Sequence, residues 1–255
     1  MNSKIIFITG ATAGIGKAIA YRFAEHGWDV VITGRRLDRL QDLEKDLENN
    51  YGVRVLSFVL DVRKKEEVFQ CVRDLPYDWK KIDVLVNNAG LASGFSLVQE
   101  GDPDDWDKMI DTNLRGLLYV TRAIVPLMIE NHSGHIINLS SIAGKEAYLR
   151  GNVYCATKFA VDALTKSMRI DLLQNGIKVT SIDPGAVETE FSIVRFKGDT
   201  ERAKKTYAGY EPLHAEDIAD IAYFAATRPA HVVLNDIVVT PLAQANVANF
   251  YKKPE

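Results

Sequence analysis

Short apolar runs rich in β-branched residues alternate along the chain with longer stretches of helical periodicity. This alternation is typical of parallel strands that are joined by crossover helices. The runs at residues 84–86 and 136–139 do not alternate polar with apolar positions, as expected for strands that helices cover on both faces. The pattern therefore predicts an α/β fold, a doubly wound (Rossmann) parallel sheet with helices on both faces.

The same pattern predicts where the elements begin and end. We predict seven strands, at residues 5–10, 29–33, 53–59, 84–87, 135–139, 178–183 and 237–240. We predict six helices between them, at residues 14–26, 37–49, 64–75, 104–131, 153–173 and 215–226. The long fourth helix contains Pro126, where we expect a kink.

The length of 255 residues suits one large domain, because α/β domains reach roughly 250 residues. We therefore predict a single Rossmann-type domain over residues 1–255. Residues 186–214 form a connection longer than a structureless loop normally is. We interpret this stretch as a mobile lid over a substrate site, and residues 241–255 as a C-terminal tail.

Composition and charge exclude several classes of protein. With 47% hydrophobic and 25% charged residues, the chain is not disordered, collagen-like or a coiled coil. Its 31 basic residues nearly balance 34 acidic ones, and the net charge of −3 provides no basic field for phosphate backbones. We expect no nucleic-acid partner.

Nothing in the sequence predicts a membrane segment or a metal site. The longest largely apolar run, residues 116–129, carries Arg122 and is shorter than the roughly 20 residues that span a bilayer. The amino end lacks the pattern of a signal peptide, so we expect a cytoplasmic protein. Cys71 and Cys155 have no metal-ligand spacing, and we expect neither a disulfide framework nor a bound metal.

A glycine-rich turn joins the first predicted strand to the first helix. The segment from Thr9 to Gly16 places glycines at positions 10, 14 and 16. Such a turn lets the backbone approach a diphosphate closely, while the helix N-terminus directs free N–H groups toward the negative charge. The spacing differs from the common Gly-x-Gly-x2-Gly dinucleotide fingerprint.

Two arginines follow the second strand, where NAD-binding folds place a carboxylate that holds the ribose 2′-hydroxyl. Arg35 and Arg36 occupy this place, and guanidinium groups match the oxygens of a 2′-phosphate. The residues therefore favour NADP(H) over NAD(H). The alternative is that both arginines are ordinary solvated charges before a helix.

Tyr154 and Lys158 are four residues apart, which places them on one face of a helix. A nearby ammonium favours the phenolate, so such a pair suits acid–base chemistry. The spacing also occurs at Tyr77 and Lys81, but Tyr77 follows Pro76 in a polar segment and is predicted to lie in a surface loop. Tyr154 instead follows a strand that ends at Ser141, at the sheet edge where ligands bind.

These motifs together resemble the short-chain dehydrogenases/reductases. The resemblance also uses Asn87 to Gly90, Asn113 and Pro184-Gly185. It implies that Tyr154 is the general acid in carbonyl reduction and the base in alcohol oxidation. It implies that Ser141, thirteen residues before the tyrosine, holds the substrate oxygen and that Lys158 lowers the tyrosine pKa and binds the nicotinamide ribose. Asn113 would anchor a water that links Lys158 to solvent.

The resemblance also implies a set of cofactor contacts from the glycine-rich turn, the strand ends and the start of the lid. They are Gly10, Thr12, Gly14, Ile15, Gly16, Arg35, Arg36, Asp61, Val62, Asn87, Ala89, Gly90, Tyr154, Lys158, Pro184, Gly185, Val187 and Thr189. Ala13 departs from the pattern, because some NADP-binding members carry a basic residue there. Phosphate recognition would then depend on Arg35 and Arg36.

Residues 189–199 and 228–232 resemble a narrower branch, the NADP-dependent 3-hydroxy acid dehydrogenases, which includes serine and allo-threonine dehydrogenases and malonic semialdehyde reductases. This resemblance implies a small hydroxy acid substrate and a homotetramer whose C-terminal segments pack across subunits. Two alternatives stay open. One is a reductase of acyl-thioester, steroid or xenobiotic carbonyls, and the other is a non-enzymatic NADP(H) sensor.

A carboxylate substrate needs a cation in a partly closed site. Arg195, in the predicted lid between Phe191 and Phe196, could bind a carboxylate with two hydrogen bonds. The alternative is a salt bridge between lid and body, and Arg150, close in sequence to Tyr154, is a rival cation.

Overall fold

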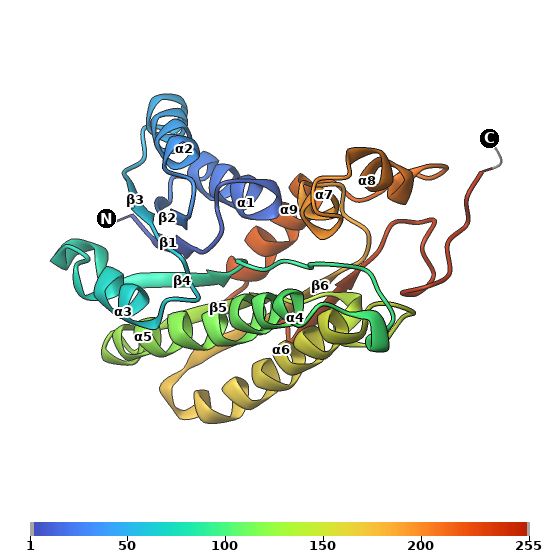
Figure 1. The fold of residues 1–255 in the computed structure, drawn as a ribbon. Helices are drawn as coiled ribbons and strands as arrows, with labels where there is room; N and C mark the ends of the chain where they lie inside the picture. Colours follow the sequence, from blue (N-terminus) through green and yellow to red (C-terminus); the bar gives the residue numbers. More distant parts are fainter. Residues whose placement is uncertain (1–2, 254–255) are drawn as a thin grey trace.

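The computed structural model describes residues 3–253, and these form one seven-stranded sheet between two layers of helices (Figure 1). The strands are β1 (Ile5–Ile8), β2 (Asp29–Gly34), β3 (Val55–Val59), β4 (Ile82–Asn87), β5 (Gly134–Leu139), β6 (Ile177–Pro184) and β7 (Asp236–Val239). The helices are α1 (Gly14–Glu25), α2 (Leu37–Tyr51), α3 (Lys65–Arg73), α4 (Pro103–Ile110), α5 (Leu117–Glu130), α6 (Asn152–Asp171), α7 (Phe191–Arg195), α8 (Thr200–Tyr207) and α9 (Ala215–Ala226).

The strand order is β3-β2-β1-β4-β5-β6-β7, and every neighbouring pair is parallel. The predicted doubly wound sheet of seven parallel strands is therefore confirmed. The order reverses between β1 and β4, which opens a crevice at the carboxyl ends of these strands. This crevice is where the fold favours a ligand.

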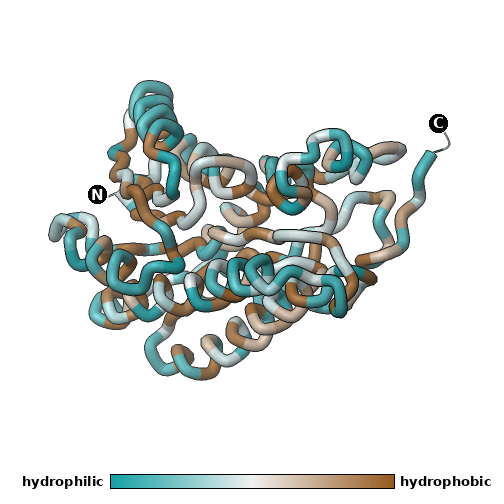
Figure 2. The backbone as a smooth tube through the Cα atoms, in the orientation of Figure 1, coloured by the Kyte–Doolittle hydropathy of each residue, from teal (hydrophilic) through white to brown (hydrophobic). Residues whose placement is uncertain are grey.

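Two apolar layers hold the helices on the sheet. On one face α1, α2 and α9 pack through residues such as Phe23, Leu43 and Ile218. On the other face α3, α5 and α6 pack through residues such as Val68 and Ile124. Figure 2 shows the corresponding colours, with apolar segments inside and polar segments along the outer side of α2. Strands buried on both faces explain why their sequences do not alternate.

The helix predicted at residues 104–131 is interrupted, and the interruption is not at Pro126. A π-helical segment, Asp111–Gly116, separates α4 from α5, and α5 continues through Pro126 to Glu130. The wider turns place Asn113 inside the protein, where it is 2% exposed. Apolar periodicity did not reveal this segment, because the helices on either side keep the ordinary period and π-helical turns are rare and short. Among the described residues, no helix is long and apolar enough to cross a membrane.

The predicted lid contains two short helices, α7 and α8, and the chain then returns to the sheet through α9 (Figure 1). The described part of the C-terminal tail packs against this region, because the amide of Lys253 donates to the carbonyl of Gly209 at 2.8 Å and the Tyr210 and Phe250 rings lie 5.2 Å apart. Whether the lid moves stays a prediction.

Candidate active site

A cavity of about 580 Å³ opens at the carboxyl ends of the central strands, below the lid. It is lined by residues of the glycine-rich turn, the ends of β2 and β4 to β6, the lid and the tail. Most of the residues predicted from the sequence meet here. The predicted residues that do not line the cavity are Gly16, Asn87, Asn113 and Arg150.

The glycine-rich turn has the backbone geometry that its glycines permit. Gly10 and Gly14 have φ angles of 69° and 52°, which side chains rarely allow. A Cβ atom at Gly16 would lie 2.4 Å from Nδ2 of Asn88 and 2.5 Å from the carbonyl of Gly10. Gly16 therefore permits the close packing of the turn although it does not face the cavity.

The same turn leaves an anion site at the start of α1. The N-cap residue Ala13 makes no side-chain hydrogen bond to the helix, so no side chain there competes for the first N–H groups. Free N–H groups and the helix dipole favour a phosphate. The cradle thus fits the diphosphate of a dinucleotide.

Arg36 is directed across this turn. Its Nε and Nη2 donate to Oγ1 of Thr12 at 3.1 and 2.9 Å, and its Nη1 lies 2.9 Å from Oε2 of Glu190 in the lid. Arg39, one helical turn further along α2, lies 2.7 Å from the other oxygen of Glu190. Arg35 is exposed at the rim of the cavity. Two cations therefore stand where the sequence predicts a 2′-phosphate, and a third lies behind them.

The adenine side of the cavity carries an ion pair that the sequence did not predict. Asp61 lines the cavity, and Arg63 lies 2.5 Å from its Oδ2. The hydrogen bond from Arg63 holds the pKa of Asp61 below its usual value. Asp61 is therefore ionised near neutral pH and available as an acceptor.

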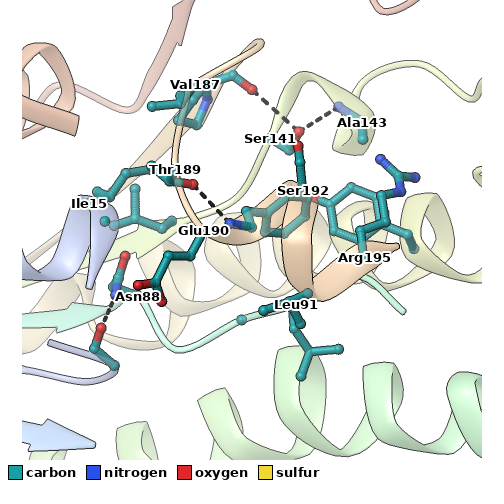
Figure 3. Close-up of a pocket in the computed structure, with 18 of the residues that line it drawn as sticks. Ile15, Asn88, Leu91, Ser141, Ala143, Val187, Thr189, Glu190, Ser192 and Arg195 are labelled. Carbon is teal, nitrogen blue, oxygen red and sulfur yellow. Dashed lines mark hydrogen bonds between the residues drawn. The ribbon is translucent and has the colours of Figure 1, made fainter. Parts of the chain in front are cut away.

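Ser141, Tyr154 and Lys158 come together from β5 and α6. Ser141 follows β5, and its hydroxyl accepts from the amide of Ala143 at 3.1 Å and donates to the carbonyl of Pro184 at 3.3 Å (Figure 3). Tyr154 is 9% exposed, and Nζ of Lys158 lies 5.9 Å from the centre of its ring. The three side chains line one end of the cavity.

Burial dominates the titration of this group. It raises the pKa of Tyr154, an effect that nearby Tyr148 strengthens and that Arg195 and a hydrogen bond with Ser141 oppose. It lowers the pKa of Lys158 to about 8, against the attraction of Asp183. The resemblance implied Lys158 as the cation that acts on the tyrosine. In this structure Nζ of Lys158 donates to the carbonyl of Leu139 at 2.9 Å, and Arg195 is the cation that favours the phenolate.

Asn113 and Asn87 make side-chain hydrogen bonds inside the protein, although Oδ1 of Asn87 is buried without a partner. The Asn113 amide exchanges two 2.8 Å hydrogen bonds with the backbone of Leu91 and donates to Oγ1 of Thr157 at 3.1 Å. Asn87, the last residue of β4, donates to Thr121 and Asn138 in the core. Asn87 thus fastens strands, and its neighbour Asn88 is the one that lines the cavity.

Arg195 enters the cavity from α7 and lies among aromatic rings. The centre of its guanidinium is 5.0 Å from the ring centre of Phe95, 5.3 Å from that of Tyr148 and 5.4 Å from that of Tyr154. Its Nη2 donates to the Tyr148 hydroxyl, while its Nε is buried without a partner. Within residues 3–253, no carboxylate forms a salt bridge with it.

The structure bears on both alternatives to Arg195 as a ligand of the substrate. Salt bridges between lid and body are made by other residues, among them Lys197, whose Nζ lies 2.8 Å from Oδ2 of Asp105 in α4. Arg150 is exposed at a φ of 63° and lies outside the cavity lining. Figure 3 shows Arg195 close to Ser192, on the side of the cavity opposite Ile15 and Asn88.

Several lining residues were not predicted from the sequence. Tyr148 and Phe95 come from loops, and nothing local marks them as ligands of Arg195. Gln244 of the tail accepts from the amide of Ala186 at 2.9 Å, a contact between segments 58 residues apart. Arg39 does not line this cavity, but its place three residues after Arg36, the N-cap residue of α2, is a local signal that the two side chains lie close together.

Comparisons with known proteins identify the family of this chain. The family model for short chain dehydrogenases matches residues 4–199. The chain belongs to this family, and the resemblance and the enzyme class predicted from the sequence are confirmed.

Among its relatives, the chain is 48% identical over 242 residues to the NADP-dependent 3-hydroxy acid dehydrogenase YdfG of Salmonella typhi, which covers 94% of this chain and 96% of that protein. It is 44% identical to sulfoacetaldehyde reductase 2 of Chromohalobacter salexigens, over 95% of this chain and 96% of that protein. Among solved structures, the closed form of serine dehydrogenase complexed with NADP+ matches with a TM-score of 0.91 and 43% identity. The match covers 98% of this chain and 100% of that chain.

Proposed function

We propose that this protein is an NADP(H)-dependent oxidoreductase that interconverts small 3-hydroxy acids and 3-oxo acids, of the serine, allo-threonine or 3-hydroxypropanoate type. The observation that carries the proposal is Arg195, an unpaired guanidinium in the cavity beside the Tyr154 ring. Arg195 is half-buried, and its buried Nε has no hydrogen-bond partner, so an anionic ligand there would satisfy a group that the protein leaves without one. The relatives named for 3-hydroxy acids and serine support the same substrate class.

NADP(H) would be held by the cradle at Gly10 and Gly14, by Asp61 on the adenine side and by Arg35 and Arg36 at the 2′-phosphate. When bound, it supplies or accepts the hydride. The positive φ angles of Gly10 and Gly14 in the turn, and the two arginines at the cavity, support a phosphorylated dinucleotide. The relatives with NADP in their names support it as well.

The protein's own residues would handle the proton and the substrate. Burial keeps the Tyr154 phenol protonated, which suits donation of its proton to a carbonyl oxygen during reduction. Ser141 would hold that oxygen by a hydrogen bond. Lys158 would bind the nicotinamide ribose, and Arg195 would favour the phenolate that oxidation requires. Arg195 would bind the substrate carboxylate.

We also propose a homotetramer in the cytoplasm. Large apolar side chains stand exposed on two separate regions, Leu118 and Phe159 on α5 and α6, and Phe224 and Val238 on α9 and β7. Exposed apolar patches of this kind are typical of subunit contacts. Light scattering on the purified protein would measure the mass, and a monomer would contradict the tetramer.

The function is tested by initial rates with NADP+ and a panel of serine, allo-threonine, threonine and 3-hydroxypropanoate, compared with simple alcohols and sugars. We expect turnover of the acids above that of uncharged alcohols. Turnover restricted to thioester, steroid or xenobiotic carbonyls would favour the alternative reductase class. NADPH binding without turnover of any carbonyl compound would favour the sensor.

A further inference from the structure

Glu190 ties the lid to the helix that follows β2. One carboxylate oxygen lies 2.9 Å from Nη1 of Arg36 and the other lies 2.7 Å from Nη1 of Arg39. We call these three residues the Glu190 clasp. The hydrogen bonds from the two arginines hold the pKa of Glu190 below its usual value. The carboxylate is therefore charged near neutral pH.

The start of the lid, which carries Glu190, packs against the glycine-rich turn. Thr189, the residue before Glu190, packs against this turn so closely that a Cβ atom at Gly14 would lie 3.2 Å from its Cγ2. In Figure 3 Thr189 and Glu190 lie toward Ile15 and Asn88, away from the Arg195 end of the cavity. The start of the lid thus covers the part of the cavity that fits the diphosphate.

A second cavity, of about 410 Å³, lies on the other side of the clasp. The start of the lid, at Thr189 and Glu190, and the glycine-rich turn, at residues 12–14, line both cavities, whereas Arg36 lines the first and Arg39 the second. The wall between the two cavities is therefore made by the clasp together with this turn. Separation of Glu190 from the two arginines would remove the lid's part of this wall.

The clasp is one of two fastenings of the lid. Its three side chains are 40%, 41% and 43% exposed. Further along the lid, Lys197, which is 57% exposed, lies 2.8 Å from Asp105, which is 13% exposed, and the backbone amide of Gly94 donates to the carbonyl of Arg195 at 3.0 Å. Because these contacts hold the lid near α7, loss of the clasp would release only the start of the lid, which covers the glycine-rich turn.

We propose that the Glu190 clasp holds the lid over bound cofactor and sets the rate at which the cofactor leaves. The proposal rests on the proposed NADP(H) dependence. It assigns the two arginines different tasks. Arg36, which Thr12 also holds, faces the cleft and can turn to the 2′-phosphate, while Arg39 on the outer side keeps Glu190. The clasp encloses the diphosphate, which NADPH and NADH share, so it acts on both.

The test measures the dissociation rate of NADPH and of NADH by stopped-flow fluorescence, with wild type and Glu190→Gln preloaded and then mixed with excess oxidised cofactor. Loss of an exposed ion-pair network predicts release about three- to tenfold faster from Glu190→Gln, for both cofactors. Arg39→Met should show the same direction. The matched control is Glu188→Gln, because Glu188 is exposed two residues earlier in the lid and, within residues 3–253, has no ion pair.

Salt gives a second readout of the same proposal. Screening weakens an exposed ion pair, so the ratio of the Glu190→Gln rate to the wild-type rate should approach one at high salt. Release rates that do not differ between wild type and Glu190→Gln would overturn the clasp. Tighter NADPH binding by Glu190→Gln with unchanged NADH would also overturn it, because Glu190 would then be a competitor of the 2′-phosphate. Failure of the wild type to bind NADPH would instead overturn the proposed function, and the clasp with it.

Discussion

The guanidinium of Arg195 lies 5.4 Å from the ring centre of Tyr154, so the lid brings a cation to the proposed catalytic acid. A substrate that reaches both groups must carry its anion only a few bonds from its reacting oxygen. This spacing suits a three- or four-carbon hydroxy acid. Arg195 belongs to α7 of the lid and Tyr154 to α6 of the body, so the proposal assigns substrate selection to the lid.

Replacement of Tyr154 by Phe should abolish turnover while the protein still folds and binds NADPH. The phenylalanine keeps the ring but lacks the proton that the developing alkoxide needs, so we expect a loss of at least about a hundredfold in kcat. Steady-state rates and NADPH fluorescence titration measure the two properties. Tyr77→Phe is the control, since Tyr77 is 93% exposed. Near-normal hydride transfer by Tyr154→Phe would show that Tyr154 is not the catalytic acid.

Replacement of both Arg35 and Arg36 by Met should weaken NADPH binding more than NADH binding. Each lost charge-assisted hydrogen bond to the 2′-phosphate costs on the order of 1.5–3 kcal/mol. Titration calorimetry with both cofactors measures the difference, with Arg115→Met as control because Arg115 pairs with Asp111 on the surface. Equal weakening of both cofactors would show that the two arginines are structural.

Acid should destabilise the protein through His135 in β5. Its Nε2 lies 2.7 Å from Oγ1 of Thr180, and burial lowers its pKa to about 3. The unfolded chain, with a pKa near 6.5 for this group, binds the proton between about pH 6.5 and 3 while the folded protein does not. The stability present above this window is therefore lost as the pH falls through it.

Urea unfolding at pH 7 and pH 5 tests this assignment. Between pH 7 and pH 5 the free energy of unfolding should fall by about 2 kcal/mol more in the wild type than in His135→Gln, because the histidine contributes at most about 1.36 kcal/mol per pH unit. His132→Gln, at an exposed position, is the control. The same pH dependence in wild type and His135→Gln would contradict the assignment.

Gly16→Ala should unfold more readily than the wild type and bind NADPH weakly. The new methyl group would lie 2.5 Å from the carbonyl of Gly10, a backbone atom that cannot move without the turn. Gly27→Ala is the control that measures backbone strain without a clash. Gly27 has a φ of 76°, and nothing lies within 4 Å of a Cβ atom built there. We expect about 1 kcal/mol from strain at Gly27 and a larger loss at Gly16. Equal losses would argue against close packing of the turn.

The sheet and the chemical centre were accessible from the sequence because both depend on local patterns. Buried parallel strands need continuous apolar runs, the glycine turn needs its spacing, and Tyr154 and Lys158 share a helix face whatever surrounds them. The error in the long helix arose where the backbone departs from regular geometry. The π-helical segment at residues 111–116 depends on packing that no local pattern encodes.

The partners of the site residues were not accessible for a different reason. Tyr148 is 47 positions from Arg195 in the sequence, and Glu190 is 154 positions from Arg36. Phe95 reaches Arg195 from a separate loop. Their residue types are common, and their roles come from the place to which the fold brings them. Arg195 was identified through its likeness to a branch of the family, and its aromatic surroundings became visible only in the structure.

The central claim is that Arg195 binds the carboxylate of a small hydroxy acid that Tyr154 acts on. The most direct measurement compares KM for 3-hydroxypropanoate and for its methyl ester in wild type and Arg195→Met, with Arg150→Met as the control. The account predicts that Arg195→Met raises KM for the acid by at least about tenfold, as expected for a lost charge-assisted hydrogen bond, and leaves the ester and the control nearly unchanged. An equal loss on acid and ester, or a loss confined to Arg150→Met, would contradict it.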